Sequence, residues 1–263
     1  MGETREVRLG ARAHDRPVKE GRPIKKIGLL SDVHANLVAL EAVLAALGAV
    51  DALWVTGDTV GYGPDPSDVL ALLGERKAVL VAGNHDRAIA TGQGLELFNP
   101  VAAAAVFVHR GLLSAEERDL LAALPETLES APFTLCHGSL RDPLWEYVFT
   151  ATAAGASLAL AKTRHCCAGH THVPALYRRA ASGTQAVAIR HDTPYPLAEP
   201  AFLNPGSVGQ PRDNDPRAAY ATLDLDAGTV TFHRASYQVA QTQRRIRERG
   251  LPAVLADRLA FGM

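Results

Sequence analysis

Carboxylate, imidazole and amide side chains recur in short polar segments, each of which directly follows an apolar run of the length of a β-strand. The set comprises Asp32, His34, Asp58, Asn84, His85, Asp86, His137, His170 and His172. Neutral imidazole and carboxylate together suit Mn²⁺, Fe or Zn²⁺, whereas Ca²⁺ takes oxygen ligands. One carboxylate between two sets of such ligands can bridge two ions about 3.5 to 4 Å apart, an arrangement suited to hydrolysis at phosphorus. The set therefore indicates a two-metal site.

Repeated strand, loop and helix units are predicted to position the first of these residues. Apolar runs over 27–30, 52–55 and 79–82 lead into Asp32, Asp58 and Asn84, and helices are predicted over 37–47, over 67–73 and after Asp86. The three polar residues follow one another at intervals of 26 residues, the length that a βαβ crossover consumes. We therefore expect them at the carboxyl ends of parallel strands, where α/β sheets bind ligands.

The rest of the chain provides more strands and helices. A helical region over 99–123 contains a capping box that begins at Ser114. Strands at 133–135 and 166–168 lead into His137 and into the segment 169–172. Later β-rich segments are expected to form a second sheet facing the first, and two helices follow them. These strands are predicted near 175–179, 185–190, 202–204, 218–224 and 229–235, and the helices over 239–249 and 252–259.

The ordered motifs carry a specific resemblance. They read Asp32-x-His34, Gly57-Asp58-x-x-Gly61, Gly83-Asn84-His85-Asp86, a lone His137 and Gly169-His170-x-His172. This series, within residues 31–172, resembles the calcineurin-like metallophosphoesterase superfamily, and the segment 204–208 resembles its small prokaryotic phosphodiesterase branch. The resemblance implies an α/β fold: a four-layer α-β-β-α sandwich with two central mixed β-sheets and a dinuclear metal site at the carboxyl ends of the strands.

The resemblance also implies roles for individual residues. One metal ion would be held by Asp32, His34, Asp58 and His172, and the other by Asp58, Asn84, His137 and His170, with Asp58 bridging them. The implied cofactors are two divalent or trivalent transition-metal ions, Mn²⁺ first, with Fe, Zn²⁺, Ni²⁺ or Co²⁺ as alternatives. His85 would protonate the leaving oxygen, and Asp86 would orient it. A positioned imidazole acting as a general acid contributes roughly 10²- to 10⁴-fold.

The second motif departs from the protein-phosphatase and dinucleoside-tetraphosphatase branches, where it supplies a phosphate-clamping arginine. Residues 57–63 read Gly-Asp-Thr-Val-Gly-Tyr-Gly, which disfavours phosphoprotein hydrolysis but leaves a dinucleotide substrate open. The candidate phosphate contacts are Asn36, Arg141 and Arg212, since an arginine can grip a phosphate bidentately. Asn36 and Arg212 are equally compatible with turn or surface roles.

Three functions are compatible with these residues. The first is hydrolysis of phosphodiesters, in which the resemblance implies attack by a metal-bridging hydroxide with His85 as the general acid. The second is hydrolysis of diadenosine polyphosphates or other nucleotide anhydrides, because residues 61–67 loosely resemble that branch. A non-catalytic protein-binding scaffold of the same fold is the third, and it is disfavoured because His85 and every motif ligand are present.

Simpler interpretations exist for each residue alone. A strand-end aspartate is often a helix cap, and a single histidine is more often packed or exposed than a ligand. Ligands at strand ends in five separate segments favour the metal site instead. The run His165-Cys166-Cys167 lacks the Cys-x-x-Cys spacing of structural zinc sites, so its cysteines are interpreted as small core residues. His109 receives no role.

Composition excludes other classes. Lys and Arg number 27 against 28 Asp and Glu, a net charge of −1, which provides no basic field for a long nucleic acid. The apolar runs fall short of the roughly 18 to 20 residues that a membrane span needs, so no membrane partner is expected. Three cysteines, two of them adjacent, predict reduced thiols and a cytoplasmic protein. Residues 1–23 are predicted to be a disordered leader before a single domain over 24–263. A homodimer is implied by the resemblance alone.

Overall fold

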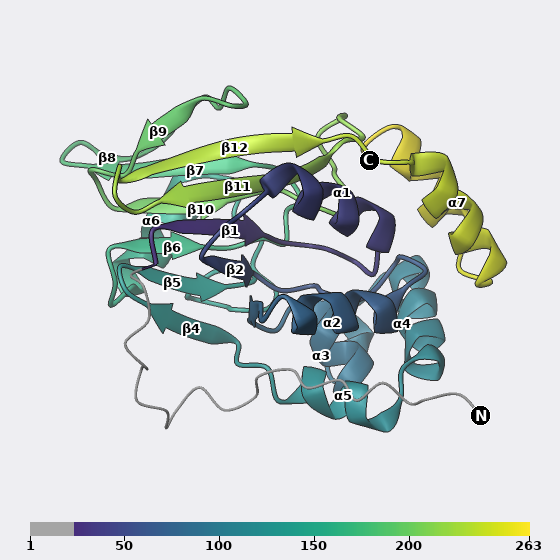
Figure 1. The fold of residues 1–263 in the computed structure, drawn as a ribbon. Helices are drawn as coiled ribbons and strands as arrows, with labels where there is room; N and C mark the ends of the chain where they lie inside the picture. The colour runs from purple at the N-terminus through teal and green to yellow at the C-terminus, as the bar shows by residue number, and fades with distance from the viewer. Residues whose placement is uncertain (1–23) are drawn as a thin grey trace.

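The fold consists of two six-stranded β-sheets packed face to face between helices, in a computed structural model that describes residues 24–263 (Figure 1). The strand order is β3-β2-β1-β11-β12-β9 in the first sheet and β4-β5-β6-β10-β7-β8 in the second. The strands are β1 (Lys26–Leu30), β2 (Ala52–Val55), β3 (Val79–Leu80), β4 (Thr127–Ser130), β5 (Phe133–Cys136), β6 (His165–Cys167), β7 (Ala175–Ala180), β8 (Gly183–Ala186), β9 (Pro194–Pro196), β10 (Ala201–Asn204), β11 (Ala218–Asp224) and β12 (Thr229–Ala235). The leader predicted over 1–23 lies outside the described residues.

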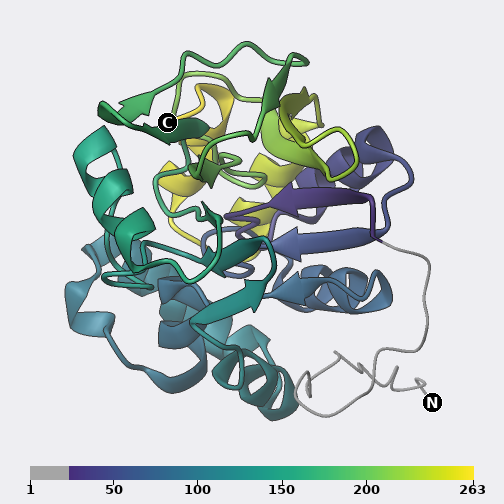
Figure 2. The same cartoon turned by 90° about the vertical axis from the view of Figure 1, so that its left-hand side faces the viewer.

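Helices cover the outer face of each sheet, and others pack on one another beyond the strand ends. The helices are α1 (Leu37–Leu47), α2 (Pro66–Glu75), α3 (Asn84–Thr91), α4 (Pro100–Leu112), α5 (Ala115–Ala122), α6 (Ala151–Leu160), α7 (Val239–Glu248) and α8 (Ala253–Asp257), with 3₁₀ turns at Leu95–Leu97 and Arg258–Ala260. Figure 2 shows α6 on one side of the two sheets and α1 and α2 on the other. The four layers α, β, β and α confirm the predicted fold class.

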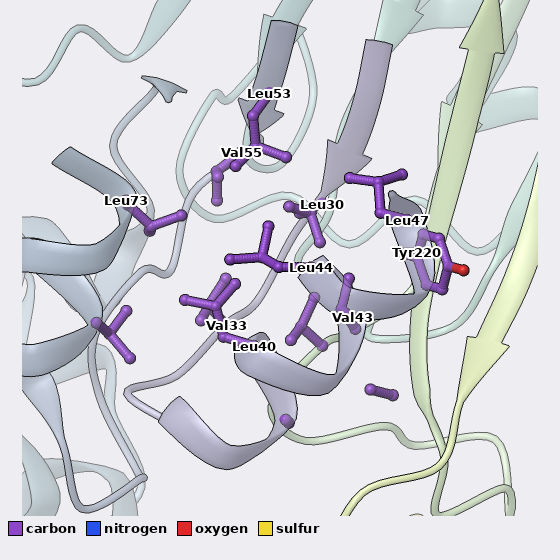
Figure 3. Packing of buried hydrophobic residues seen from close by; sticks show 14 of the residues in the cluster. Leu30, Val33, Leu40, Val43, Leu44, Leu47, Leu53, Val55, Leu73 and Tyr220 are labelled. Carbon is purple, nitrogen blue, oxygen red and sulfur yellow. The ribbon is translucent and has the colours of Figure 1, made fainter. Parts of the chain in front are cut away.

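Alternating strand side chains build the layers. In β1, Leu30 points outward and packs with Leu44 and Leu47 of α1 (Figure 3). Leu29, on the opposite face of the same strand, joins Leu135 of β5 in the cluster between the sheets. Successive strand residues face opposite sides of a sheet, so one short strand contributes to both cores. Among the residues described, no helix is both long enough and apolar enough to cross a bilayer.

Parallel pairing brings the polar strand ends together. Strand β1 is parallel to β2, and β2 is parallel to β3. In the second sheet β5 is parallel to β6, which is parallel to β10. The expectation that the motif residues follow parallel strands is therefore confirmed, and both sheets contribute strand ends to one site.

The assignment of every later strand to the second sheet is wrong. Segments 218–224 and 229–235 are strands with the predicted bounds, but β11 pairs antiparallel with β1 and β12 with β11, inside the first sheet. The physical reason is that β1 has β2 on one edge only, and the backbone groups of its other edge need partners. Strands β7, β8 and β10 do belong to the second sheet. Strand β8 lies at Gly183–Ala186, earlier than the predicted 185–190.

Candidate metal centre

Side chains from the ends of five strands converge on one buried site. Asp58, after β2, lies at its middle, with its Oδ2 atom 3.6 Å from Nε2 of His34 and 3.3 Å from Nε2 of His137. Two groups of potential metal ligands share this carboxylate: Asp32, His34, Asp58 and His172 in one, and Asp58, His137 and His170 in the other. Oδ1 of Asn84 lies 3.2 Å from Nε2 of His137, beside the second group. The structure therefore brings together the residues of both sets that the resemblance implied, with Asn84 adjoining the second group. Their assignment as metal ligands stays a prediction.

The spacing of the ligand atoms suits transition-metal ions. Nε2 of His34 and Nε2 of His172 are 3.1 Å apart, and Nε2 of His137 is 3.0 Å from Nδ1 of His170. Around one ion, with ligand bonds of about 2.0 to 2.2 Å, neighbouring ligand atoms lie about 3.0 to 3.5 Å apart. The buried donors therefore fit two divalent ions that share Asp58.

The second nitrogen of each imidazole in these groups faces a backbone carbonyl. A carbonyl only accepts hydrogen bonds, so this nitrogen carries the hydrogen, and in the neutral ring the other nitrogen presents its lone pair to the centre. The four contacts are His34 Nδ1 to Val60 O at 3.2 Å, His137 Nδ1 to Thr56 O at 2.9 Å, His170 Nε2 to Trp145 O at 3.1 Å and His172 Nδ1 to Gln210 O at 2.5 Å. Backbone geometry thus selects, for the neutral form of every histidine in the two groups, the tautomer that could bind a metal ion.

The backbone at the site is strained. Left-handed φ angles occur at Asp32 (50°), His34 (47°), Asp58 (50°), His170 (67°) and His172 (59°). Such conformations cost on the order of 1 to 3 kcal/mol each in a non-glycine residue and persist where the surrounding structure enforces them. Their concentration on the ligand residues is typical of a functional site.

Two motif glycines are required by close approach. A Cβ atom at Gly83 would overlap the carboxylate of Asp58, and one at Gly169 would overlap the hydroxyl of Ser31. Gly83 precedes Asn84 and Gly169 precedes His170, so each glycine lets a ligand-bearing segment pack directly on another. The Gly-Asn-His-Asp and Gly-His motifs therefore have a steric basis.

Burial and charge perturb the pKa values of the ligand groups in opposite directions. Burial raises the pKa of Asp32 to about 7. Burial also opposes ionisation of Asp58, but the imidazoles of His137, His85 and His34 hold its pKa below the ordinary value. Burial lowers the pKa of His137, yet Asp58 and Asp32 outweigh it and raise that pKa to about 9. The site therefore keeps a buried, ionised carboxylate at its centre, where a cation is favoured.

His85 differs from the four histidines of the ligand groups. It lies in the first turn of α3, is 3% exposed and packs edge-on against His34, with ring centroids 5.1 Å apart. Within residues 24–263, Nδ1 of His85 has no hydrogen-bond partner. Burial lowers its pKa to about 4. No carbonyl therefore fixes the tautomer of His85 through Nδ1.

Asp86 has different partners from those the sequence predicts. Its carboxylate accepts hydrogen bonds from the backbone N–H groups of Thr59 at 3.2 Å, Val60 at 3.0 Å and Gly83 at 3.0 Å. In the described part of the chain, none of its hydrogen bonds reaches the ring of His85. Asp86 therefore holds the loop after β2 against α3, and any effect on His85 passes through the backbone.

The three predicted phosphate contacts lie in different surroundings. Asn36 is the N-cap of α1: its Oδ1 accepts from Ala39 N at 3.2 Å, and its Nδ2 donates to Gly209 O at 2.9 Å. Arg141 is half-exposed and forms an ion pair with Glu146. Both side chains have partners within the protein.

Arg212 faces the metal centre. Its Nη2 donates to Oε1 of the buried Gln210 at 2.9 Å, and its guanidinium carbon lies 5.9 Å from the ring centre of Tyr62. Burial lowers the pKa of His172 most, and the positive charge of Arg212 lowers it further. Of the two arginines, Arg212 is therefore the one that adjoins the ligand residues, and its backbone N–H donates to the carbonyl oxygen of His172 at 3.4 Å.

Sequence reasoning missed His109. This residue of α4 is 0% exposed; its Nδ1 accepts from Gly61 N at 3.1 Å and its Nε2 donates to Gly63 O at 2.8 Å. The two bonds fix the loop that carries Tyr62, whose ring lies 4.3 Å from that of His85. No spacing in the sequence connects residue 109 with this loop, because the contact exists only after α4 packs on it.

Known proteins with similar sequences or structures point to one superfamily. The profile of the calcineurin-like phosphoesterase superfamily domain matches residues 26–228. The crystal structure of a metallophosphoesterase from Sphaerobacter thermophilus superposes on this chain with a TM-score of 0.84. The two sequences are 42% identical, and the match covers 92% of this chain and 100% of the other. An uncharacterized protein of Methanocaldococcus jannaschii is 28% identical over 245 residues, which cover 90% of this chain and 98% of the relative. A symmetrical bis(5'-nucleosyl)-tetraphosphatase of Pectobacterium carotovorum is 43% identical over 63 residues, 22% of each protein.

The matched region contains the three parallel strands, both ligand groups and the glycines that allow their close approach. Superfamily, fold and buried Asp and His clusters thus agree, and they indicate a hydrolase that binds divalent metal ions. This chain belongs to the calcineurin-like phosphoesterase superfamily.

Proposed function

We propose that the protein hydrolyses phosphodiesters with two bound metal ions, Mn²⁺ being the first choice. The observation that carries the proposal is the position of Asp58, whose Oδ2 atom lies within 3.6 Å of a histidine from each ligand group. Two ions held there would supply positive charge against the phosphoryl oxygens and a water of lowered pKa. The ligands of the proposal are Asp32, His34, Asp58 and His172 for one ion, and Asp58, Asn84, His137 and His170 for the other.

The remaining roles belong to side chains next to these ligands. We assign the protonation of the leaving oxygen to His85, which adjoins His34 and whose Nδ1 has no partner among the described residues. A phosphate anion bound beside His85 favours its imidazolium and so counteracts the effect of burial on its pKa. Arg212 would orient the phosphate, since a guanidinium can donate two parallel hydrogen bonds to phosphate oxygens. In this proposal Asn36 and Arg141 have structural roles.

The test is hydrolysis of bis-p-nitrophenyl phosphate and of p-nitrophenyl phosphate by metal-stripped protein as Mn²⁺ is added in steps. The expected result is turnover that requires the metal and is faster for the diester. Turnover that does not respond to the metal, or a monoester rate above the diester rate, contradicts the proposal. An absence of turnover with Mn²⁺, Fe²⁺, Zn²⁺, Ni²⁺ and Co²⁺ would favour the non-catalytic scaffold.

A second candidate function is the hydrolysis of dinucleoside polyphosphates. It is supported by the similarity over 63 residues to a bis(5'-nucleosyl)-tetraphosphatase. The two candidates are separated by comparing diadenosine tetraphosphate with a simple diester at equal concentration. Negligible cleavage of the dinucleotide excludes the second candidate.

We also propose that the protein works in a reducing compartment such as the cytoplasm. Cys136, Cys166 and Cys167 are buried and free. Buried thiols without disulfides are typical of intracellular proteins. Retention of all three thiols in protein purified from its own cells, measured by mass spectrometry after alkylation in denaturant, is the expected result.

A further inference from the structure

Three ring side chains lead from the metal centre to the protein surface. The ring of Tyr147 stacks on that of the ligand His170, with centroids 3.8 Å apart and planes 20° apart. The ring of Phe149 is nearly parallel to that of Tyr147, at 5.8 Å and 8°. The outermost ring therefore lies less than 10 Å from a side chain of the metal site.

The two outer rings are exposed in spite of their apolar area. Tyr147 is 49% exposed and Phe149 is 60% exposed, whereas His170 is buried. Each large aromatic side chain stabilises a complex mainly through the area that it buries, so exposed stacked rings beside a catalytic site favour a flat ligand. Phe107 of α4 is 61% exposed, close to the value for Phe149, but it lies outside this group of rings and provides a comparison.

A positive charge lies near the metal centre. The guanidinium carbon of Arg212 is 5.9 Å from the ring centre of Tyr62. The ring of Tyr62 in turn lies 4.7 Å from that of His34, a residue of the first ligand group. A ligand reaching this surface therefore meets a cation and the metal ligands at one end and open ring faces at the other.

From this arrangement we infer that Tyr147 and Phe149 form a binding surface for an aromatic group attached to the substrate phosphate. The inference rests on the proposed function and narrows its substrate class to nucleoside phosphodiesters. A nucleobase is a flat aromatic group joined to phosphate through one sugar, a span that matches the separation of less than 10 Å between His170 and Phe149. Stacking on aromatic side chains tolerates every base, because each base has a π-face. The surface therefore selects nucleosides over alkyl groups rather than one base over another.

The first experiment measures binding without turnover. Calorimetry on the Mn²⁺-loaded protein compares adenosine 5'-monophosphate with ribose 5-phosphate, which carries the same phosphate and sugar but no base. The nucleotide should bind about 5- to 100-fold more tightly. In Phe149→Leu the ratio of the two affinities should fall at least about 3-fold, because the nucleotide binds more weakly while ribose 5-phosphate binds as before. Phe107→Leu should leave this ratio unchanged. Equal affinities in the unaltered protein, or an unchanged preference in Phe149→Leu, overturn the inference.

The second experiment uses two diesters with the same p-nitrophenolate leaving group, one carrying thymidine and the other ethyl. Phe149→Leu should raise KM for the thymidine ester with little change in kcat, and it should leave KM for the ethyl ester unaltered. If both diesters are hydrolysed with equal KM, the ring surface is refuted while the proposed function stands. If neither is hydrolysed but the nucleotide preference is present and sensitive to Phe149→Leu, the proposed function fails and the binding surface stands.

Discussion

Replacing His109 with leucine should destabilise the protein by removing both anchors of one loop. The buried imidazole accepts from Gly61 N at 3.1 Å and donates to Gly63 O at 2.8 Å, and leucine of similar size can do neither. Each buried backbone group left without a partner costs about 1 to 3 kcal/mol, so the expected loss is about 2 to 6 kcal/mol. His109→Gln keeps a donor and an acceptor and should lose about half as much.

The effect should also depend on pH. Burial lowers the pKa of His109 to about 4, whereas an unfolded histidine titrates near 6.5. Because the folded-state pKa is the lower one, the stability that neutral His109 contributes is present above pH 6.5. It is lost as pH falls towards 4, since the unfolded chain then gains a proton that the folded chain does not. The difference between the two pKa values corresponds to a change of about 3 kcal/mol in the free energy of unfolding. This change should be absent in His109→Gln.

The assay is urea unfolding of chelator-treated protein, followed by tryptophan fluorescence at pH 7 and pH 5. The exposed His191 provides the control, because His191→Leu should change the free energy of unfolding by less than about 0.5 kcal/mol. A loss below 1 kcal/mol in His109→Leu at pH 7 would refute the anchoring role. If the free energy of unfolding falls equally between pH 7 and pH 5 in wild type and in His109→Gln, the titration argument is refuted.

Further predictions concern the metal centre. His85→Ala should keep its metal content but lose about 10²- to 10⁴-fold in kcat on a diester with an alkyl leaving group, and full activity would remove His85 as the acid. Asp58→Asn should bind fewer than two ions per chain by elemental analysis, and two retained ions would contradict the bridging role. Arg212→Ala should raise KM for the diester about 10- to 100-fold while Arg141→Ala changes it less than about 3-fold, and the reverse order would transfer the phosphate contact to Arg141. Removal of metal by a chelator should lower the free energy of unfolding by about 2.7 kcal/mol relative to protein at 100 times the Kd for Mn²⁺, and an unchanged Tm would contradict metal binding to the folded state.

Several features of the fold lay beyond sequence patterns. Strand β9 has only three residues, two of them proline, so it is too short to show an alternation of apolar and polar residues. Helix α6 (Ala151–Leu160) is mostly alanine and other apolar or small residues, so it shows no hydrophobic period of a helix. The capping box at Ser114, in contrast, is purely local, and it forms as predicted with Glu117. Local chemistry was therefore readable from neighbouring residues, while elements that depend on distant partners were not.

The sequence by itself predicted the parallel strands and the polar residues that gather at their ends, and its motifs resembled the superfamily. It could do so because a strand that leads into a polar turn and a helix has a short-range pattern, and parallel strands bring such turns to one edge. Tertiary structure alone decided that β11 lies in the first sheet and that Asp86 binds backbone amides. It also decided that Arg212 lies over the ring of Tyr62 while Arg141 pairs with Glu146. It also placed His109 under the loop of Tyr62. Each of these depends on contacts between segments far apart in the chain, which no local spacing encodes.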